Sequence, residues 1–129
     1  MKPKPLANCR VLVIEDEYFI GDDLEKVLGE HGAHVIGPIG NLDQAMAQVS
    51  EDGFEIAVVD INLHDEAAYP VADELRRRNV PFVFATGYSR ETIPPRFEDV
   101  ELWEKPYDEH ELVKSIARLC KELGTSSSG

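Results

Sequence analysis

Residues 9–17 read CRVLVIEDE, a short apolar run that changes abruptly into three consecutive acids. Residues 11–14 are all branched and apolar, which is typical of a strand buried on both faces of a parallel sheet. The three acids, Glu15, Asp16 and Glu17, therefore follow the carboxyl end of that strand. This stretch predicts a buried strand that opens onto an acidic edge.

Four further segments have the composition of short strands: 33–39, 56–59, 81–85 and 100–104. The last three end in polar residues that can take part in chemistry: Asp60, then Thr86 with Gly87, then Lys105 with Pro106. In an open parallel sheet, ligands bind outside the carboxyl ends of the strands. We therefore expect these side chains to meet the acids of the first strand at one edge.

Helical periodicity fills the intervals between the strands and predicts helices over 20–31, 41–50, 70–78 and 108–123. Their boundaries carry the usual signals: a capping box at Asn41, Pro70 in a first turn, a second capping box at Asp108, and Gly32 as a stop. Between 89 and 99, Pro94 and Pro95 exclude a long helix, so one turn and a mobile loop are expected there. The alternation predicts a three-layer α/β/α sandwich, doubly wound around a parallel sheet.

The chain of 129 residues is long enough for one compact domain, which we expect over 7–123, with 1–6 and 124–129 as flexible termini. Its formal charge of −12 argues against nucleic acid or an anionic membrane as the direct partner. Apolar runs are too short to span a bilayer, and no signal core opens the chain, which predicts a cytoplasmic protein. Cys9 and Cys120 are expected to be two reduced thiols.

Three carboxylates at one sheet edge, Glu15, Asp16 and Asp60, would repel one another unless a cation neutralised them. All-oxygen ligands without His or Cys suit a hard ion. An open site of carboxylates, a carbonyl and waters fits Mg²⁺ better than Ca²⁺. The sequence therefore predicts a magnesium site.

The motifs VLVIEDE, VVDINL, FATG and EKP, in this order and spacing, resemble the receiver domain of two-component response regulators across residues 7–123. The resemblance implies a flavodoxin-like fold with strand order 2-1-3-4-5. It makes Asp60 the phosphoacceptor. It also implies a metal site made by Glu15, Asp16, Asp60 and the backbone carbonyl of Asn62, and a phosphoryl-binding switch made by Thr86, Gly87, Lys105 and Pro106, with a cis bond before Pro106.

Three positions depart from the usual receiver pattern. Leu102 stands where receivers carry a switching aromatic residue, and Trp103 is expected to face the other side of the sheet. His64 replaces the usual loop proline; as a lone histidine it is more typical of a solvated loop than of a metal ligand. Gly87 after Thr86 resembles the FATGUY subgroup of stand-alone receivers, which often work with HWE-type histidine kinases. Tyr88 either shields the phosphoryl group from water or covers the sheet edge.

The resemblance implies a signalling domain and not an enzyme: a histidine kinase, of HWE type or another, or a phosphotransfer protein supplies the phosphoryl group, and the output is altered binding of a downstream protein. Dimerisation on phosphorylation stays open, and we expect no output domain in this chain. One alternative is a docking domain that has lost the switch, which Leu102 and His64 favour. A magnesium-dependent phosphohydrolase is disfavoured, because Asn62 stands where such enzymes need an acidic proton donor.

Overall fold

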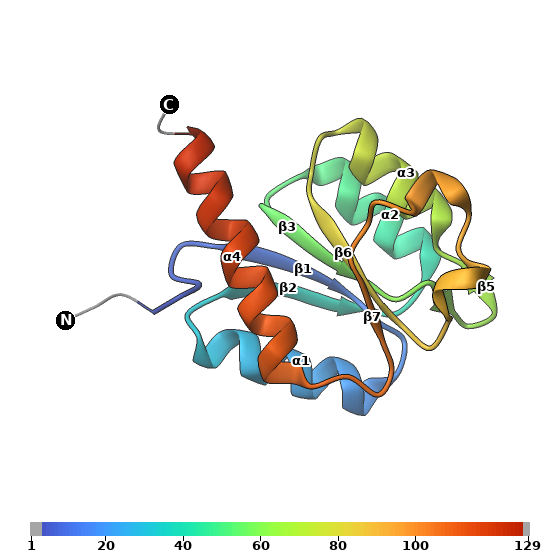
Figure 1. Cartoon of the computed structure of the whole chain (residues 1–129), viewed down its shortest axis with the longest axis horizontal. Helices are drawn as coiled ribbons and strands as arrows, with labels where there is room; N and C mark the ends of the chain where they lie inside the picture. Colours follow the sequence, from blue (N-terminus) through green and yellow to red (C-terminus); the bar gives the residue numbers. More distant parts are fainter. Residues whose placement is uncertain (1–3, 128–129) are drawn as a thin grey trace.

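The computed structural model describes the backbone of residues 4–127 and the side chains of residues 4–123. Five parallel strands form the central sheet: β1 (Arg10–Ile14), β2 (His34–Ile39), β3 (Ile56–Val59), β6 (Phe82–Thr86) and β7 (Leu102–Glu104). Their spatial order is β2-β1-β3-β6-β7, which confirms the flavodoxin-like topology (Figure 1).

Helices cover both faces of this sheet. On one side lie α1 (Tyr18–Glu30) and α4 (Glu109–Ser127), and on the other lie α2 (Leu42–Glu51) and α3 (Tyr69–Arg77) (Figure 1). Alternate residues of one strand serve the two layers: Leu12 and Ile14 pack toward α2 and α3, while Val11 and Val13 pack toward α1 and α4. A strand buried on both faces needs a continuous apolar run, which is the pattern seen in the sequence.

The predicted helix signals form as expected at three helices. The Asn41 side chain accepts a hydrogen bond of 2.8 Å from the backbone N–H of Gln44, which caps α2. Pro70 lies in the first turn of α3, where its missing N–H costs no helical hydrogen bond. Gly32, after the end of α1, has a φ of +98°, which a residue with a side chain rarely adopts.

The loop after β3 is more ordered than predicted. It forms a small antiparallel hairpin of β4 (Asn62–Leu63) and β5 (Glu66–Ala67). The two turn residues, His64 and Asp65, have φ values of +49° and +68°. Two-residue hairpin turns of this handedness suit the twist of the flanking strands, and aspartate and histidine tolerate such φ values better than most residues.

The segment that replaces a fourth helix contains two short 3₁₀ turns, η1 (Arg90–Thr92) and η2 (Pro95–Phe97). The expected shortening is confirmed, but the expected mobile loop is wrong, because Phe97 is fully buried in the core. The Arg90 guanidinium also donates hydrogen bonds to the backbone carbonyls of Phe97 and Val100, at 3.3 and 2.7 Å. Buried apolar contacts and these hydrogen bonds replace the missing helical ones.

The domain boundaries at 7 and 123 stay a prediction, but ordered residues lie on both sides of them. Leu6 is fully buried, and its N–H donates to the His31 carbonyl at 2.8 Å. Helix α4 continues to Ser127. Predicted flexibility at residues 1–3 and 128–129 lies outside the described residues.

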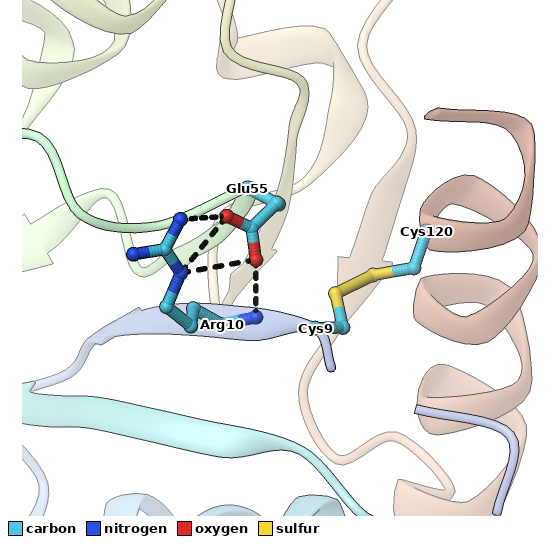
Figure 2. The surroundings of a disulfide bond; sticks show 4 residues. All are labelled: Cys9, Arg10, Glu55 and Cys120. Carbon is cyan, nitrogen blue, oxygen red and sulfur yellow. Dashed lines mark hydrogen bonds and ion pairs between the residues drawn. A yellow bond between two sulfur atoms is a disulfide. The ribbon is translucent and has the colours of Figure 1, made fainter. Parts of the chain in front are cut away.

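The expectation of two reduced thiols is wrong, because Cys9 and Cys120 form a disulfide bond (Figure 2). Their Cα atoms lie 6.4 Å apart although 111 residues separate them along the chain. Neither spacing nor composition indicates this pairing. It arises because α4 returns across the sheet to the start of β1.

Phe97→Ala tests whether the aromatic side chain anchors this irregular segment. Phe97 stacks on Tyr69 at 5.8 Å and meets Phe84 edge-on at 5.6 Å. Its truncation is expected to lower the free energy of unfolding by about 3–5 kcal/mol in urea, with an unchanged m-value. Phe19→Ala is the matched control, since Phe19 is 79% exposed and its loss should change stability by about 0.5 kcal/mol or less. Equal losses in the two variants would contradict this assignment.

Candidate functional site

Strand register brings Glu15 and Asp60 side by side. The residues before them, Ile14 and Val59, are direct partners in the β1–β3 ladder. The N–H of Asp60 donates to the Ile14 carbonyl at 2.8 Å, and the N–H of Glu15 donates to the Ile39 carbonyl at 2.9 Å. Both acidic residues are buried, at 5% and 3% exposure. Two buried carboxylates therefore end adjacent strands at the same sheet edge.

The Lys105 ammonium lies between these acids. Its Nζ is 2.8 Å from Glu15 Oε1, 2.9 Å from Asp60 Oδ2 and 2.8 Å from Glu17 Oε1. The backbone N–H of Lys105 donates to the Thr86 carbonyl at 2.7 Å, which extends the β6–β7 pairing by one residue. The Lys105–Pro106 peptide is cis, as the resemblance implied. Lys105 thus supplies a fixed positive charge at the carboxylates.

Four acids can present one oxygen each within 4.8 Å of one another: Glu15, Asp16, Glu17 and Asp60. Glu17 was not predicted as a site residue, although its place in the acidic run was a signal that could have found it. The donor set is entirely oxygen. A hard divalent cation fits this set, because it satisfies charges that one ammonium balances only in part.

Burial and the neighbouring Asp60 carboxylate raise the pKa of Glu15 to about 8, and the hydrogen bond from Lys105 limits the rise. Burial works against the charged form of Lys105, but hydrogen bonds to Glu15, Glu17 and Asp60 outweigh it and raise the pKa of that ammonium. Lys105 therefore stays charged at neutral pH, whereas Glu15 binds a proton readily without a metal ion.

The hairpin after β3 holds two further predicted residues near the acids. The N–H of Asn62 donates to Asp60 Oδ1 at 3.2 Å. The N–H of His64 donates to Asp16 Oδ2 at 2.9 Å, and the imidazole Nδ1 of His64 lies 3.6 Å from the same oxygen. The expectation of a merely solvated His64 is incomplete: its side chain is exposed, yet its backbone positions Asp16.

Thr86 and Tyr88 form the β6 side of the edge. Thr86 is fully buried, and its Oγ1 accepts a hydrogen bond of 3.4 Å from the Tyr88 backbone N–H. Tyr88 is 36% exposed. A Cβ built at Gly87 would meet no atom within 4 Å, so the backbone beside Thr86 borders open space. Thr86 is thus joined to Lys105 through the backbone and to Tyr88 through its hydroxyl.

Leu102 and Trp103 point to opposite faces of the sheet, as predicted. Leu102 packs against the core beneath α2 and α3, whereas Trp103 packs against the core beneath α1 and α4. The indole N–H of Trp103 donates to Glu101 Oε2 at 2.7 Å. Trp103 therefore does not replace the aromatic residue that is missing at position 102.

Tyr107 is a second residue that the sequence did not assign to the site. Its hydroxyl is buried without a hydrogen-bond partner in the described part of the chain. Burial, followed by the negative charge of Glu15, raises the pKa of this phenol. The ring packs with the core beneath α1 and α4, two residues after Lys105.

A family model described as "Response regulator receiver domain" matches residues 11–117. Among curated proteins, the chain is 26% identical over 117 residues to the sensory transduction protein LytT of Bacillus cereus, covering 88% of this chain and 48% of LytT. It is 25% identical over 111 residues to the transcriptional regulatory protein PdtaR of Mycobacterium tuberculosis, covering 83% of this chain and 54% of PdtaR. The chain spans about half the length of these curated relatives.

Two solved structures of response regulators superpose on this chain over most of its length. The receiver domain of the Erythrobacter litoralis PhyR response regulator superposes with a TM-score of 0.77 at 28% identity, covering 88% of this chain and 91% of that one. SdrG from Pseudomonas melonis Fr1, in a BeF3-activated conformation, superposes with a TM-score of 0.71 at 33% identity, covering 88% of this chain and 98% of that one.

Among the described residues, no helix has the length and apolar character needed to cross a membrane.

The pKa of Glu15 predicts a pH-dependent stability without metal. Folding raises this pKa from 4.5 to about 8, so the folded state binds the proton more tightly. The stabilisation is complete below pH 4.5 and is lost as the pH rises through about 8. In EDTA, urea unfolding should show a loss of about 2 kcal/mol between pH 6 and pH 8. Glu15→Gln should flatten this slope; an equally steep slope in that variant would contradict the assignment.

Proposed function

The chain belongs to the response regulator receiver domain family, and from this we propose that Asp60 accepts a phosphoryl group from a phosphohistidine and that the change in charge alters what the domain binds. The observation that carries the proposal is the buried Asp60 carboxylate, which lies 2.9 Å from the Lys105 ammonium. Three more acids can bring an oxygen within 4.8 Å. A nucleophile, a cation and a set of metal ligands thus occupy one sheet edge.

In the proposed reaction a carboxylate oxygen of Asp60 forms a bond to phosphorus while the phosphorus–nitrogen bond of the phosphohistidine breaks. Lys105 stabilises the charge that develops on the phosphoryl oxygens, because its ammonium is already held beside Asp60. The main contributions of the protein are positioning and charge, which suit a domain that phosphorylates itself from a donor.

We assign the metal site to Glu15, Asp16, Asp60 and the backbone carbonyl of Asn62, with Glu17 as an added candidate. When bound, Mg²⁺ supplies positive charge to the phosphoryl oxygens. Asp16 is pre-positioned for this role by the His64 N–H at 2.9 Å. Hydrogen bonds from the hairpin backbone to Asp60 and Asp16 orient both carboxylates before any cation arrives.

The phosphoryl group on Asp60 would compete for the hydroxyl of Thr86. That hydroxyl accepts a long hydrogen bond of 3.4 Å from Tyr88, and long hydrogen bonds are weak. Turning the hydroxyl toward a dianion would release the Tyr88 backbone and shift the segment 89–103. Leu102 cannot act as an aromatic switch, so we assign the conformational change on phosphorylation to the loop after Thr86. The open space at Gly87 allows the backbone to move, and Tyr88 moves with it when its hydrogen bond to Thr86 breaks.

We propose a histidine kinase, of HWE type or another, or a phosphotransfer protein as donor, a cytoplasmic location and an unidentified protein as receiver of the signal. SdrG, which is 33% identical to this chain, has a BeF3-activated conformation, and this supports a change of conformation on activation here as well. The alternative of a docking domain without phosphorylation keeps some support from Leu102. The intact set of acids and Lys105 favours the phosphoacceptor.

Asp60→Asn tests the phosphoacceptor. Wild-type protein incubated with Mg²⁺ and acetyl phosphate should gain the mass of one phosphoryl group by intact-protein mass spectrometry, and Asp60→Asn or EDTA should abolish the gain. Asp65→Asn is the matched control, because Asp65 is an exposed acid on the adjacent turn and should label normally. Absence of label in wild-type protein, even with phosphorylated kinases, would favour the docking domain.

Lys105→Met separates charge stabilisation from metal binding. Loss of the ammonium should slow labelling by acetyl phosphate at least about a hundredfold. Mg²⁺ affinity, measured by calorimetry, should hold or rise, because the ammonium no longer occupies the carboxylates. Lys114→Met is the control, since Lys114 is 72% exposed on α4 and should leave both measurements unchanged. A fast-labelling Lys105→Met protein would remove Lys105 from the proposed reaction.

A further inference from the structure

The disulfide lies at the opposite end of the sheet from the acidic site. Cys9 immediately precedes β1, and Cys120 lies in the C-terminal half of α4 (Figures 1 and 2). The bond therefore joins the central strand layer to the last helix of the chain. Nothing in the phosphoryl-transfer proposal uses it.

The two sides of this bond are held very differently. The Cys9 carbonyl accepts from the His34 N–H at 2.9 Å. The next residue, Arg10, binds Glu55, which immediately precedes β3: the backbone N–H of Arg10 donates to Glu55 Oε1 at 2.7 Å, and its Nε donates to Oε2 at 2.9 Å (Figure 2). Cys9 is 5% exposed. The strand side therefore stays fixed whether or not the disulfide exists.

The helix side depends more on the disulfide. The first half of α4 buries Leu112, Val113 and Ile116 in the core. From residue 117 to residue 123, no side chain is buried, and Ala117, Leu119 and Cys120 are only half-buried. Arg118 reaches Glu101 at 3.1 Å, but its side chain is 61% exposed, and exposed ion pairs contribute little. The covalent bond from Cys120 to Cys9 is therefore the strongest restraint on the C-terminal half of α4.

A groove gives solvent access to the bond. Its volume is about 1160 Å³, and both cysteines line it together with Phe54, Pro81, Arg118 and Leu123. Cys120 is the less buried of the two cysteine residues, which favours attack by a reductant from the helix side of the bond. In a reducing compartment, such as the cytoplasmic location proposed above, disulfides are mostly transient or redox-sensing.

From this asymmetry we propose that Cys9–Cys120 is a redox-responsive staple that fixes the C-terminal half of α4 to β1 when oxidised and releases it when reduced. A dithiol reductant attacks Cys120 Sγ as a thiolate, and the S–S bond breaks with Cys9 leaving as the thiolate. The second thiol of the reductant then displaces Cys120, so the reductant becomes a disulfide and the protein gains two hydrogens. The C-terminal half of α4 is then no longer covalently joined to the residue before β1.

Hydrogen exchange followed by mass spectrometry tests the proposal on the full chain, with and without millimolar dithiothreitol and without acetyl phosphate. Reduction should add the mass of two hydrogen atoms. Amide exchange in residues 117–127 should speed up about tenfold or more, while exchange in β1 and β3 stays unchanged. The readout does not involve phosphorylation, so its failure leaves the proposed function intact.

Two variants sharpen the result. Cys120→Ser should exchange rapidly in this region under both conditions, and the partly exposed position tolerates a hydroxyl. Arg118→Ala should keep slow exchange while the disulfide is intact. Equal exchange in oxidised and reduced wild type would overturn the staple. So would two free thiols that resist oxidation by diamide, a disulfide that dithiothreitol reduces only in denaturant, or rapid exchange in oxidised Arg118→Ala.

Discussion

The Lys105 ammonium is the interaction on which the polar edge of this sheet depends. Without it, Glu15 and Asp60 would be buried carboxylates facing one another, which is among the least favourable arrangements in a protein interior. One ammonium cannot fully neutralise this group of acids. The burial that raises the pKa of Glu15 is therefore also what makes the site receptive to a divalent cation.

That arrangement is inseparable from the sheet. Glu15 and Asp60 are neighbours because Ile14 and Val59 are paired, and Lys105 reaches them because β7 pairs with β6 up to Glu104 and Thr86. The strands β1, β3 and β6 are buried on both faces, so a shift of one residue would turn their side chains into the wrong layer. Packing of the two cores therefore fixes the register, and the register fixes the distances among the acids and the lysine.

The two ends of the sheet have different characters. The carboxyl end concentrates negative charge around one lysine and carries the hairpin that orients Asp60 and Asp16. At the opposite end, the Cys9–Cys120 disulfide joins α4 to the residue before β1, and the ion pair of Arg10 with Glu55 joins the starts of β1 and β3. Between them, Glu101 precedes β7 and accepts hydrogen bonds from Trp103 on that strand and from Ser115 and Arg118 on α4. This carboxylate links the last strand to the last helix.

Local signals in the sequence determined the element types and the cap at Asn41, because apolar periodicity and capping residues are local properties. The order of the strands was predicted from the family pattern. The polar residues at the strand ends predicted Glu15, Asp60 and Lys105 as members of one site. Tertiary structure alone decided what depends on segments that meet in space. Phe97 is buried in a loop that was expected to be mobile. The His64 backbone N–H donates a hydrogen bond to Asp16, and Glu17 lies among the acids of the site. Tertiary structure also joined Cys9 to Cys120 across 111 residues. No spacing rule encodes such contacts, since each results from the path the whole chain takes around its sheet.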